Sequence, residues 1–192
     1  RCRRFRIWRK LRRRRYPNQR LYAPGRGKFA ALLPDAEIFH KAVDWALRYD
    51  EFFAAKEIET ARRLLGKGRE RVAALRTGQA PWLDATGLVV RGYRSRLDDS
   101  VQPYGLFVPP HLAREQSSPL LVWLLGRGEK RTELGFLGER EAGAPQLVPR
   151  DTVVLIPYGR YCNATKFAGE VDVFEAMAAV RGEFRVDAQR IA

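Results

Sequence analysis

The sequence has few of the residues that build disulfide frameworks or metal centres. Its 192 residues include two cysteines, Cys2 and Cys162, and two histidines, His40 and His111, and none of the four has a second sulfur or nitrogen ligand close to it in the sequence. Disulfide scaffolds use several cysteines, and zinc sites use closely spaced Cys and His pairs. We therefore expect no metal site and no cofactor, and the cysteines do not indicate a redox compartment.

Long apolar runs and an initiator are also missing. The longest apolar runs, such as residues 120–126, are too short to span a bilayer, and no apolar region follows the basic start of the chain. These absences argue against a membrane span and against a secretory signal peptide. Since Met177 is the only methionine, we expect the chain to be a segment of a longer reading frame, cut at both ends.

Acidic residues are absent from residues 1–30, which hold 13 Arg or Lys residues. The other 162 residues carry 23 basic and 22 acidic side chains, so this arm supplies almost all of the net charge of +14. Such an arm could bind nucleic-acid phosphates or an anionic membrane surface, with Phe5, Trp8, Tyr16 and Tyr22 stacking on bases. It could equally be a disordered tail or non-native sequence.

Two stretches after the arm have helical periodicity. Residues 32–53 and 54–78 carry apolar side chains at steps of three and four, which predicts two amphipathic helices forming a hairpin. The predicted inner face of the first comprises Ile38, Ala42, Trp45, Tyr49 and Phe52, and that of the second Ile58, Ala61, Leu65, Val72 and Leu75. Pro34 in the first turn, or Asp35 as N-cap, begins the first helix.

Beyond residue 86 the pattern changes to that of strands. We expect strands at 87–95, 102–110, 119–126 and 151–159, the last two fully buried because their apolar runs are unbroken. A polar, Gly-rich connection with one helical turn follows the third strand. Residues 167–184 then predict a helix with Val171, Phe174, Met177 and Ala178 inside, and the final "VDAQRIA" opens a further strand. The alternation predicts an α/β fold with a parallel sheet.

Four stretches taken in order resemble a known family. They are "GLVVRGYRSRLDDSVQPYGLFVPP", "LLVWLLGRGEKRTELGFL", "VLIPYGRYCNATKFAGEVDVFEAM" and the terminal "VDAQRIA". Over residues 32–192 the series is similar to the N-terminal half of the α/β-hydrolase superfamily, in its prolyl-oligopeptidase-like or esterase-like branch. The resemblance implies a serine hydrolase that cleaves a small-molecule ester or a peptide.

In that family a "D-x-x-R-I-A" strand leads directly into the G-x-S-x-G turn that carries the nucleophile, and the acid and the histidine follow. The resemblance therefore places the catalytic serine beyond Ala192, and we expect this chain alone to be inactive. None of its four serines, Ser95, Ser100, Ser117 and Ser118, lies in a G-x-S-x-G context. Removing the nucleophile strand should also leave the third strand with an unpaired edge.

The resemblance also indicates an oxyanion-binding loop. In this fold the loop after the third strand donates a backbone N–H to the oxyanion, which makes Gly126, Arg127 and Gly128 the candidates. Leu125 stands where relatives usually have histidine. The alternative is a tight left-handed turn without a catalytic role.

A second loop, "PYGRYCNATKFAGE", follows a strand end, where α/β sheets place ligands. Tyr158, Arg160, Tyr161 and Asn163 are candidates to line a substrate crevice, or else capping and turn residues. We interpret Glu170 and Asp172 as charges that favour a helix N-terminus.

The sequence thus divides into three parts: a basic arm at 1–30, a helical segment at 31–82, and the first half of a hydrolase domain at 83–192. Two alternatives remain open. One is a nucleic-acid-binding protein acting through the arm, and the other is a non-catalytic α/β module that binds a carbohydrate or a protein partner.

Overall fold

The computed structural model of the chain describes residues 27–113, 115–143, 149–160 and 165–192. The chain divides into two compact units, Arg1–Ala31 and Leu32–Ala192. In the first unit the described part contains the short helix α2, Gly27–Ala30. The predicted roles of Phe5, Trp8, Tyr16 and Tyr22 concern positions outside the described residues.

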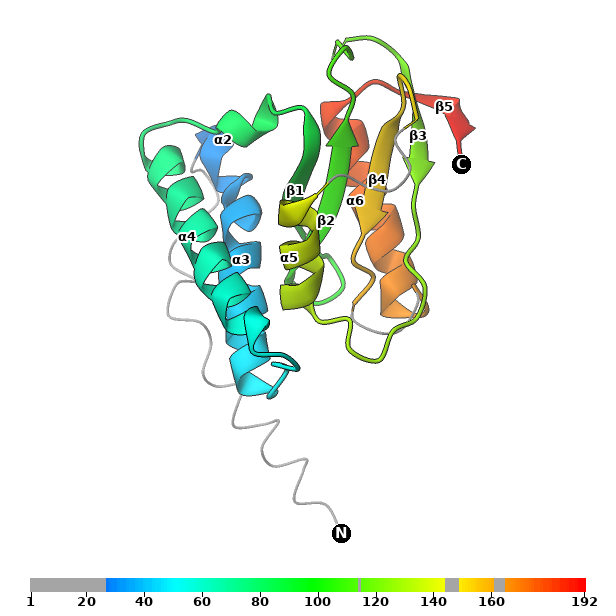
Figure 1. Ribbon diagram of the computed structural model, residues 1–192. Coiled ribbons are helices and arrows are strands. Elements are labelled where there is room, and N and C mark those ends of the chain that lie inside the picture. Colours follow the sequence, from blue (N-terminus) through cyan, green and yellow to red (C-terminus); the bar gives the residue numbers. More distant parts are fainter. Residues whose placement is uncertain (1–26, 114, 144–148, 161–164) are drawn as a thin grey trace. The chain divides into compact units, whose positions relative to one another are not determined.

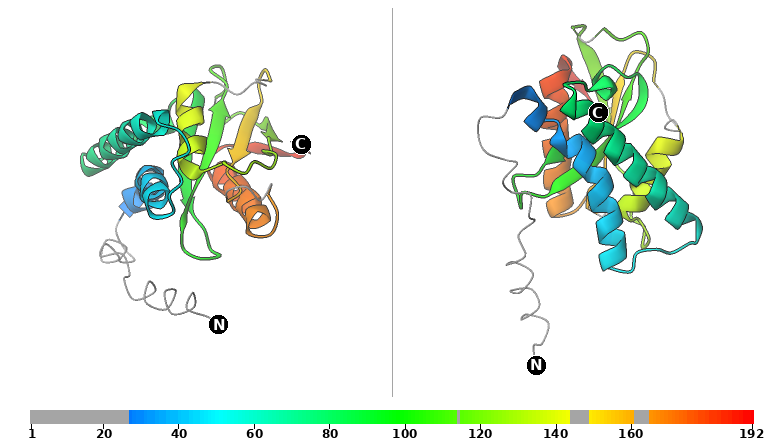
Figure 2. Two further views of the ribbon diagram at one scale, coloured as in Figure 1. Left: turned by 60° about the horizontal axis from the view of Figure 1, so that its bottom comes forward. Right: turned by 90° about the vertical axis from the view of Figure 1, so that its left-hand side faces the viewer.

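The second unit is a five-stranded sheet with helices on both faces (Figure 1, Figure 2), which confirms the predicted α/β fold. Helices α3 and α4 form the predicted hairpin, α3 and α5 pack on one face of the sheet, and α6 packs on the other. The helices are α3 (Leu33–Arg48), α4 (Lys56–Arg76), α5 (Glu133–Ala142) and α6 (Ala168–Glu183), with the 3-10 turn η2 (Pro81–Leu83). The strands are β1 (Gly87–Arg94), β2 (Val101–Val108), β3 (Ser118–Val122), β4 (Val153–Pro157) and β5 (Val186–Ile191).

The prediction of a parallel sheet is wrong for its first two strands: the sheet is mixed, with strand order β1-β2-β4-β3-β5. Strand β2 is antiparallel to β1 and β4, whereas β3 is parallel to β4 and β5. The strand predicted at the C-terminus is therefore present. The expectation that the outer edge of β3 is unpaired is wrong, because β5 pairs with β3 up to Val122. The Val122 N–H donates to the Ala192 carbonyl at 2.7 Å, and the Ala192 N–H donates to the Leu120 carbonyl at 3.1 Å.

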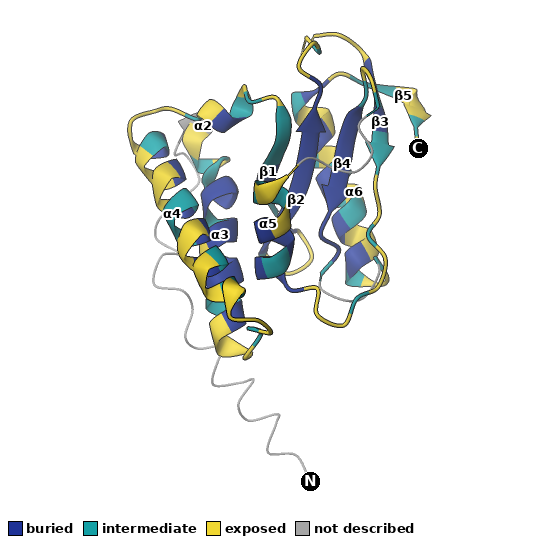
Figure 3. Cartoon of the chain, viewed as in Figure 1, coloured by how far each residue is buried: buried dark blue, intermediate teal, exposed yellow. Residues whose placement is uncertain are grey.

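Alternating side chains of the central strands build two cores. Val154 and Ile156 of β4 face α3 and α5, whereas Val153 and Leu155 face α6. Both β2 and β4 are buried along their whole length (Figure 3). The prediction that the third strand is fully buried is wrong, since Trp123 and Leu124 are exposed just beyond β3.

A buried polar network joins α3 to the sheet. Pro34 lies in the first turn of α3, while the Asp35 side chain is turned inward instead of capping the helix. Its carboxylate accepts hydrogen bonds from Trp82 Nε1 (2.9 Å), Arg91 Nε (3.0 Å) and the Gly92 N–H (2.7 Å).

The predicted face of α4 is rotated from the observed one. Ile58 and Val72 are exposed, and the buried residues are Ala61, Leu64, Gly68, Arg71 and Leu75. Gly68 explains the difference: a Cβ there would lie 3.2 Å from Phe39 Cβ, so the missing side chain lets α3 approach closely.

Other predicted side-chain positions also differ. Tyr49 of the first predicted face is exposed, as are Val171 and Phe174 on α6. The buried residues of α6 are instead Gly169, Asp172, Ala176 and Val180.

The connection after the third strand is also longer than predicted. In place of the single predicted helical turn the structure has the ten-residue helix α5, whose N-cap Thr132 accepts a hydrogen bond from the Gly135 N–H at 2.9 Å.

No helix in the described ranges is both long enough and apolar enough to cross a membrane.

Candidate functional site

The parallel strands β3 and β4 end at the same edge of the sheet, and the two loops singled out from the sequence follow them there. The Tyr158 hydroxyl, directly after β4, donates to the Arg131 carbonyl in the loop after β3 at 3.0 Å. The Phe136 and Tyr158 rings are 5.1 Å apart, centroid to centroid. The two loops therefore contact each other, although the bonded residues are 27 positions apart in the sequence.

The loop after β3 has backbone N–H groups that are not hydrogen-bonded to any described residue. Gly126 and Arg127 are exposed and Gly128 is half-buried, and their N–H groups have no hydrogen-bond partner among the described residues. Neither glycine has a positive φ, so the left-handed turn considered as the alternative is not formed. Leu125 packs against the core beneath α3 and α5.

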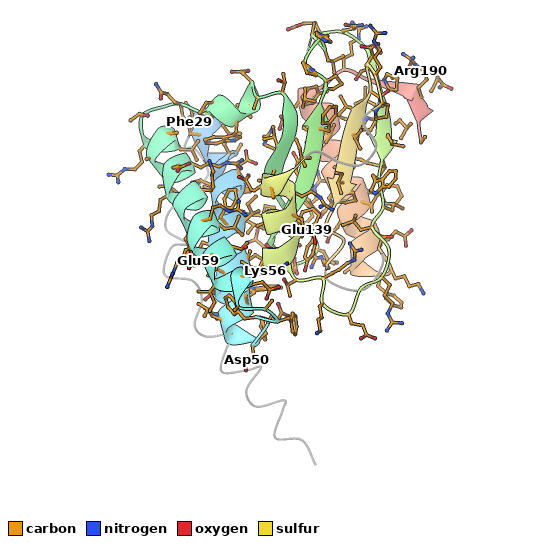
Figure 4. All side chains as sticks on the ribbon, in the orientation of Figure 1. Phe29, Asp50, Lys56, Glu59, Glu139 and Arg190 are labelled. Carbon is orange, nitrogen blue, oxygen red and sulfur yellow. The ribbon has the colours of Figure 1, made fainter. Side chains whose placement is uncertain are left out.

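A small cavity, here called the loop cavity, lies between these loops and the start of α5. Its volume is about 50 Å³, enough for a few water molecules. The lining residues come from both loops and from α5: Leu125, Gly126, Lys130, Arg131, Thr132, Gly135, Phe136, Glu139, Tyr158 and Thr165. Glu139, labelled in Figure 4, belongs to α5. Gly126 and Tyr158, predicted for different roles, therefore lie on one cavity wall.

The Arg160 side chain joins the loop after β4 to α6 and to the β1–β2 turn. Its Nε donates to both carboxylate oxygens of Asp172 on α6 (3.0 and 2.9 Å), and its other nitrogens donate to Asp98 (2.6 Å) and to Ser95 Oγ (2.9 Å) in the β1–β2 turn. These bonds hold Arg160 at a φ of 57°, a conformation that a residue with a side chain rarely adopts. Asp172 is thus the partner of Arg160 and not only a helix-terminus charge.

The pKa values of the two carboxyl groups bound to Arg160 shift in opposite directions. Burial raises the pKa of Asp172, and the hydrogen bonds from Arg160 oppose this only in part. For Asp98 the hydrogen bonds from Arg160 and Ser100 outweigh burial and lower the pKa. Of the other crevice candidates, Tyr158 is buried, and Tyr161 and Asn163 lie outside the described residues.

A larger cavity of about 330 Å³, here called the acidic cavity, opens on the α3 side of the same edge. It is lined by Trp45, Tyr49, Glu51, Gln102, Glu133, Tyr158 and Arg160. Tyr158 borders both cavities and Arg160 borders this one. No local pattern marks Glu51, Gln102 or Glu133 as site residues, and the helical periodicity of residues 32–53 predicts a packing role for Trp45 and Tyr49.

Glu133, one of the lining residues of the acidic cavity, belongs to a buried ion pair. Lys41 Nζ donates to Glu133 Oε2 at 2.6 Å, with 7% and 4% of the two side chains exposed. Burial raises the pKa of Glu133, although Lys41 opposes the change. One sequence signal pointed to this pair: Lys41 lies on the apolar face of a helix, where a lysine is rarely buried unless it is paired.

Among the described residues there is neither a group placed to hold a metal ion nor a serine paired with a histidine, and Ser100 Oγ instead donates to the Asp98 carboxylate at 2.6 Å. No group of three or more His, Cys, Asp or Glu side chains within the described ranges is placed to hold a metal ion. His40 and His111 are exposed, and no hydrogen bond joins either of them to one of the four serines, all of which are described.

No protein-family model matches the chain, and no curated protein matches it. Among solved structures, the chain is similar to part of a thermostable esterase, with a TM-score of 0.39 and 22% sequence identity. The superposition covers 55% of this chain and 33% of the esterase, so the chain spans about a third of that protein. It assigns no role to any residue here.

Proposed function

We propose that residues 32–192 form the N-terminal part of a serine hydrolase domain, an esterase or peptidase of the prolyl-oligopeptidase-like type, whose nucleophile lies beyond Ala192. Acyl transfer by such an enzyme needs an activated serine and donors that stabilise the oxyanion. In this proposal the loop after β3 supplies one oxyanion donor, and residues that follow Ala192 supply the serine, the second donor, the acid and the histidine.

The pairing of β5 with β3 carries the proposal. The two hydrogen bonds of Ala192, to Leu120 and Val122, place it opposite Leu121 in a parallel pair. Paired strands have nearly the same rise per residue. A chain that continued past Ala192 in the same register would therefore lie beside Gly126 after about five residues. A strand-to-helix turn at that point would hold its serine beside the loop after β3, as the G-x-S-x-G elbow requires.

The open N–H groups of Gly126, Arg127 and Gly128 are consistent with this role. A tetrahedral intermediate is stabilised by donors that no protein acceptor already occupies. Gly126 also has no atom within 4 Å of the position of a Cβ, which leaves space for a substrate to approach the backbone. Leu125 stands in place of the usual histidine, and its side chain, unlike an imidazole, cannot donate a hydrogen bond.

The test is a chain extended with the residues that follow Ala192 in its gene, treated with a fluorophosphonate probe and with p-nitrophenyl esters. We expect one serine to be labelled, within about ten residues of Ala192 and in a G-x-S-x-G turn. Substitution of that serine by Ala should abolish both labelling and ester hydrolysis.

Two results would count against the proposal. One is a downstream sequence without a G-x-S-x-G turn in that interval. The other is a folded, extended chain, shown by a cooperative unfolding transition, that neither reacts with the probe nor cleaves esters.

A further inference from the structure

The acidic cavity has the size of a small-molecule site. Its volume of about 330 Å³ lies at the lower end of the range for ligand pockets. Trp45, Tyr49 and Glu51 come from the C-terminal end of α3 and the residues after it, where Figure 4 labels Asp50. Glu133 begins α5 opposite them. The cavity is therefore built from elements that lie far apart in the sequence.

Glu133, which lines the cavity, has one buried polar atom without a partner among the described residues. Glu133 Oε2 is paired with Lys41, but Oε1 has no hydrogen-bond partner in the described part of the chain, although only 4% of the side chain is exposed. A buried carboxylate oxygen without a donor is costly, and such groups usually have a partner in the functional state. This atom points to a ligand that brings an N–H or O–H donor.

The charges around the cavity favour a cation. Lys41 is paired with Glu133, and Arg160 is shared between Asp98 and Asp172. Glu51, which also lines the cavity, is not in any ion pair formed by the described side chains. The carboxylates thus exceed the cations that the walls provide.

The aromatic wall also suits a cation. Trp45 and Tyr49 pack edge to face, with centroids 5.9 Å apart and an interplanar angle of 86°. Lys41 Nζ already lies 4.3 Å from the centroid of the Trp45 ring, so this surface attracts an ammonium group within the protein itself. Tyr49 is 61% exposed, at the mouth of the cavity.

We propose that the acidic cavity binds an organic cation that carries N–H donors, a primary ammonium or a guanidinium group. The N–H donors distinguish this ligand from a quaternary ammonium, which cannot satisfy Glu133 Oε1. A metal ion is not favoured, since no three ligating side chains converge within the described ranges. The inference needs no catalytic serine; where the hydrolase proposal also holds, the cation is a basic group of the substrate.

The test is an NMR titration of the 192-residue chain with n-butylguanidinium and n-butylammonium, using the indole N–H of Trp45 as reporter. We expect saturable binding with a Kd on the order of 1 mM, as befits ligands of so few atoms. Butanol and tetramethylammonium, which lack the charge or the N–H donors, should bind at least about tenfold more weakly.

Matched variants locate the site. Glu51→Gln should weaken binding of both cations about fivefold, the size of effect expected for one partly exposed charge. Glu70→Gln makes the same chemical change on the exposed side of α4, away from the cavity, and should leave binding unchanged. Glu133→Gln should weaken binding further, in samples whose circular dichroism confirms folding.

Absence of saturable binding by either cation would overturn the inference, and it would mean that water alone satisfies Glu133. Equal affinity for butanol, or equal effects of Glu51→Gln and Glu70→Gln, would overturn it as well. Because binding is measured without catalysis, none of these results bears on the hydrolase proposal, and failure of serine labelling does not bear on the cation site.

Discussion

Replacement of Asp35 by Ala tests the polar network that fixes α3 to the sheet. The carboxylate is 1% exposed and accepts from Trp82, Arg91 and Gly92 at 2.7 to 3.0 Å. Arg91 keeps a second partner, since its two terminal nitrogens donate to Glu183 at 2.6 and 2.7 Å. The substitution therefore leaves two neutral donors unpaired and one guanidinium half-compensated.

Removing one member of a buried ion pair costs about 3–5 kcal/mol, and each orphaned buried donor costs about 1–3 kcal/mol. Because Arg91 keeps Glu183, its own loss lies below the full cost of breaking a buried ion pair, and with the two orphaned neutral donors we expect Asp35→Ala to lower the free energy of unfolding by about 3–5 kcal/mol. Urea unfolding followed by circular dichroism measures this loss at an unchanged m-value.

The matched control is Glu37→Ala on the same helix. Glu37 pairs with Arg94 at 2.7 Å, but 35% of its side chain is exposed, so the loss should stay below about 1 kcal/mol. A loss for Asp35→Ala below about 1 kcal/mol, or one equal to that of Glu37→Ala, would refute the reasoning that burial makes this network essential.

Three further predictions concern the site and the arm. In a chain extended past Ala192, Arg127→Pro removes a candidate oxyanion donor and should lower kcat for ester hydrolysis about 10²- to 10³-fold. Arg127→Ala keeps the backbone N–H, so kcat for ester hydrolysis should stay unchanged. Because burial raises the pKa of Glu51, the folded chain holds that proton more tightly than the unfolded chain, and stability falls as pH rises through both pKa values. Glu51→Gln should remove this part of the slope in a plot of urea midpoint against pH, and an unchanged slope contradicts the assignment. If the arm binds nucleic acid, deleting residues 1–30 should abolish salt-dependent binding of RNA or DNA, measured by fluorescence anisotropy; binding that survives the deletion excludes the arm.

Local patterns were enough to predict most elements of the second unit. The change from helical to alternating periodicity near residue 86 marks the passage from α4 to β1, because the two backbone geometries place neighbouring side chains differently. The final strand was predicted from seven residues, and β5 covers six residues of the chain at that position. These features depend on interactions within a short segment.

The inner faces of the helices were less predictable from apolar spacing. On α4, Arg71 is buried and Val72 is exposed, because the Arg71 guanidinium lies over the Phe39 and Trp82 rings and donates to the Asp35 carbonyl. On α6, Asp172 is buried against Arg160 while Phe174 is exposed. Arg71 and Asp172 are buried because each has a polar partner inside the fold, Asp35 and Arg160 respectively. Each partner lies on a different element of the fold, so apolar spacing within one helix does not reveal it.

The same distinction applies to the candidate site. The sequence by itself determined that two loops, around Gly126 and Arg160, follow strand ends of an α/β sheet, because strands and loops are specified by neighbouring residues. Only the tertiary structure brought α3 and α5 together at that edge, so that Glu51 and Glu133 line one cavity. Contacts across such sequence distances arise from packing of whole elements, which no local pattern records.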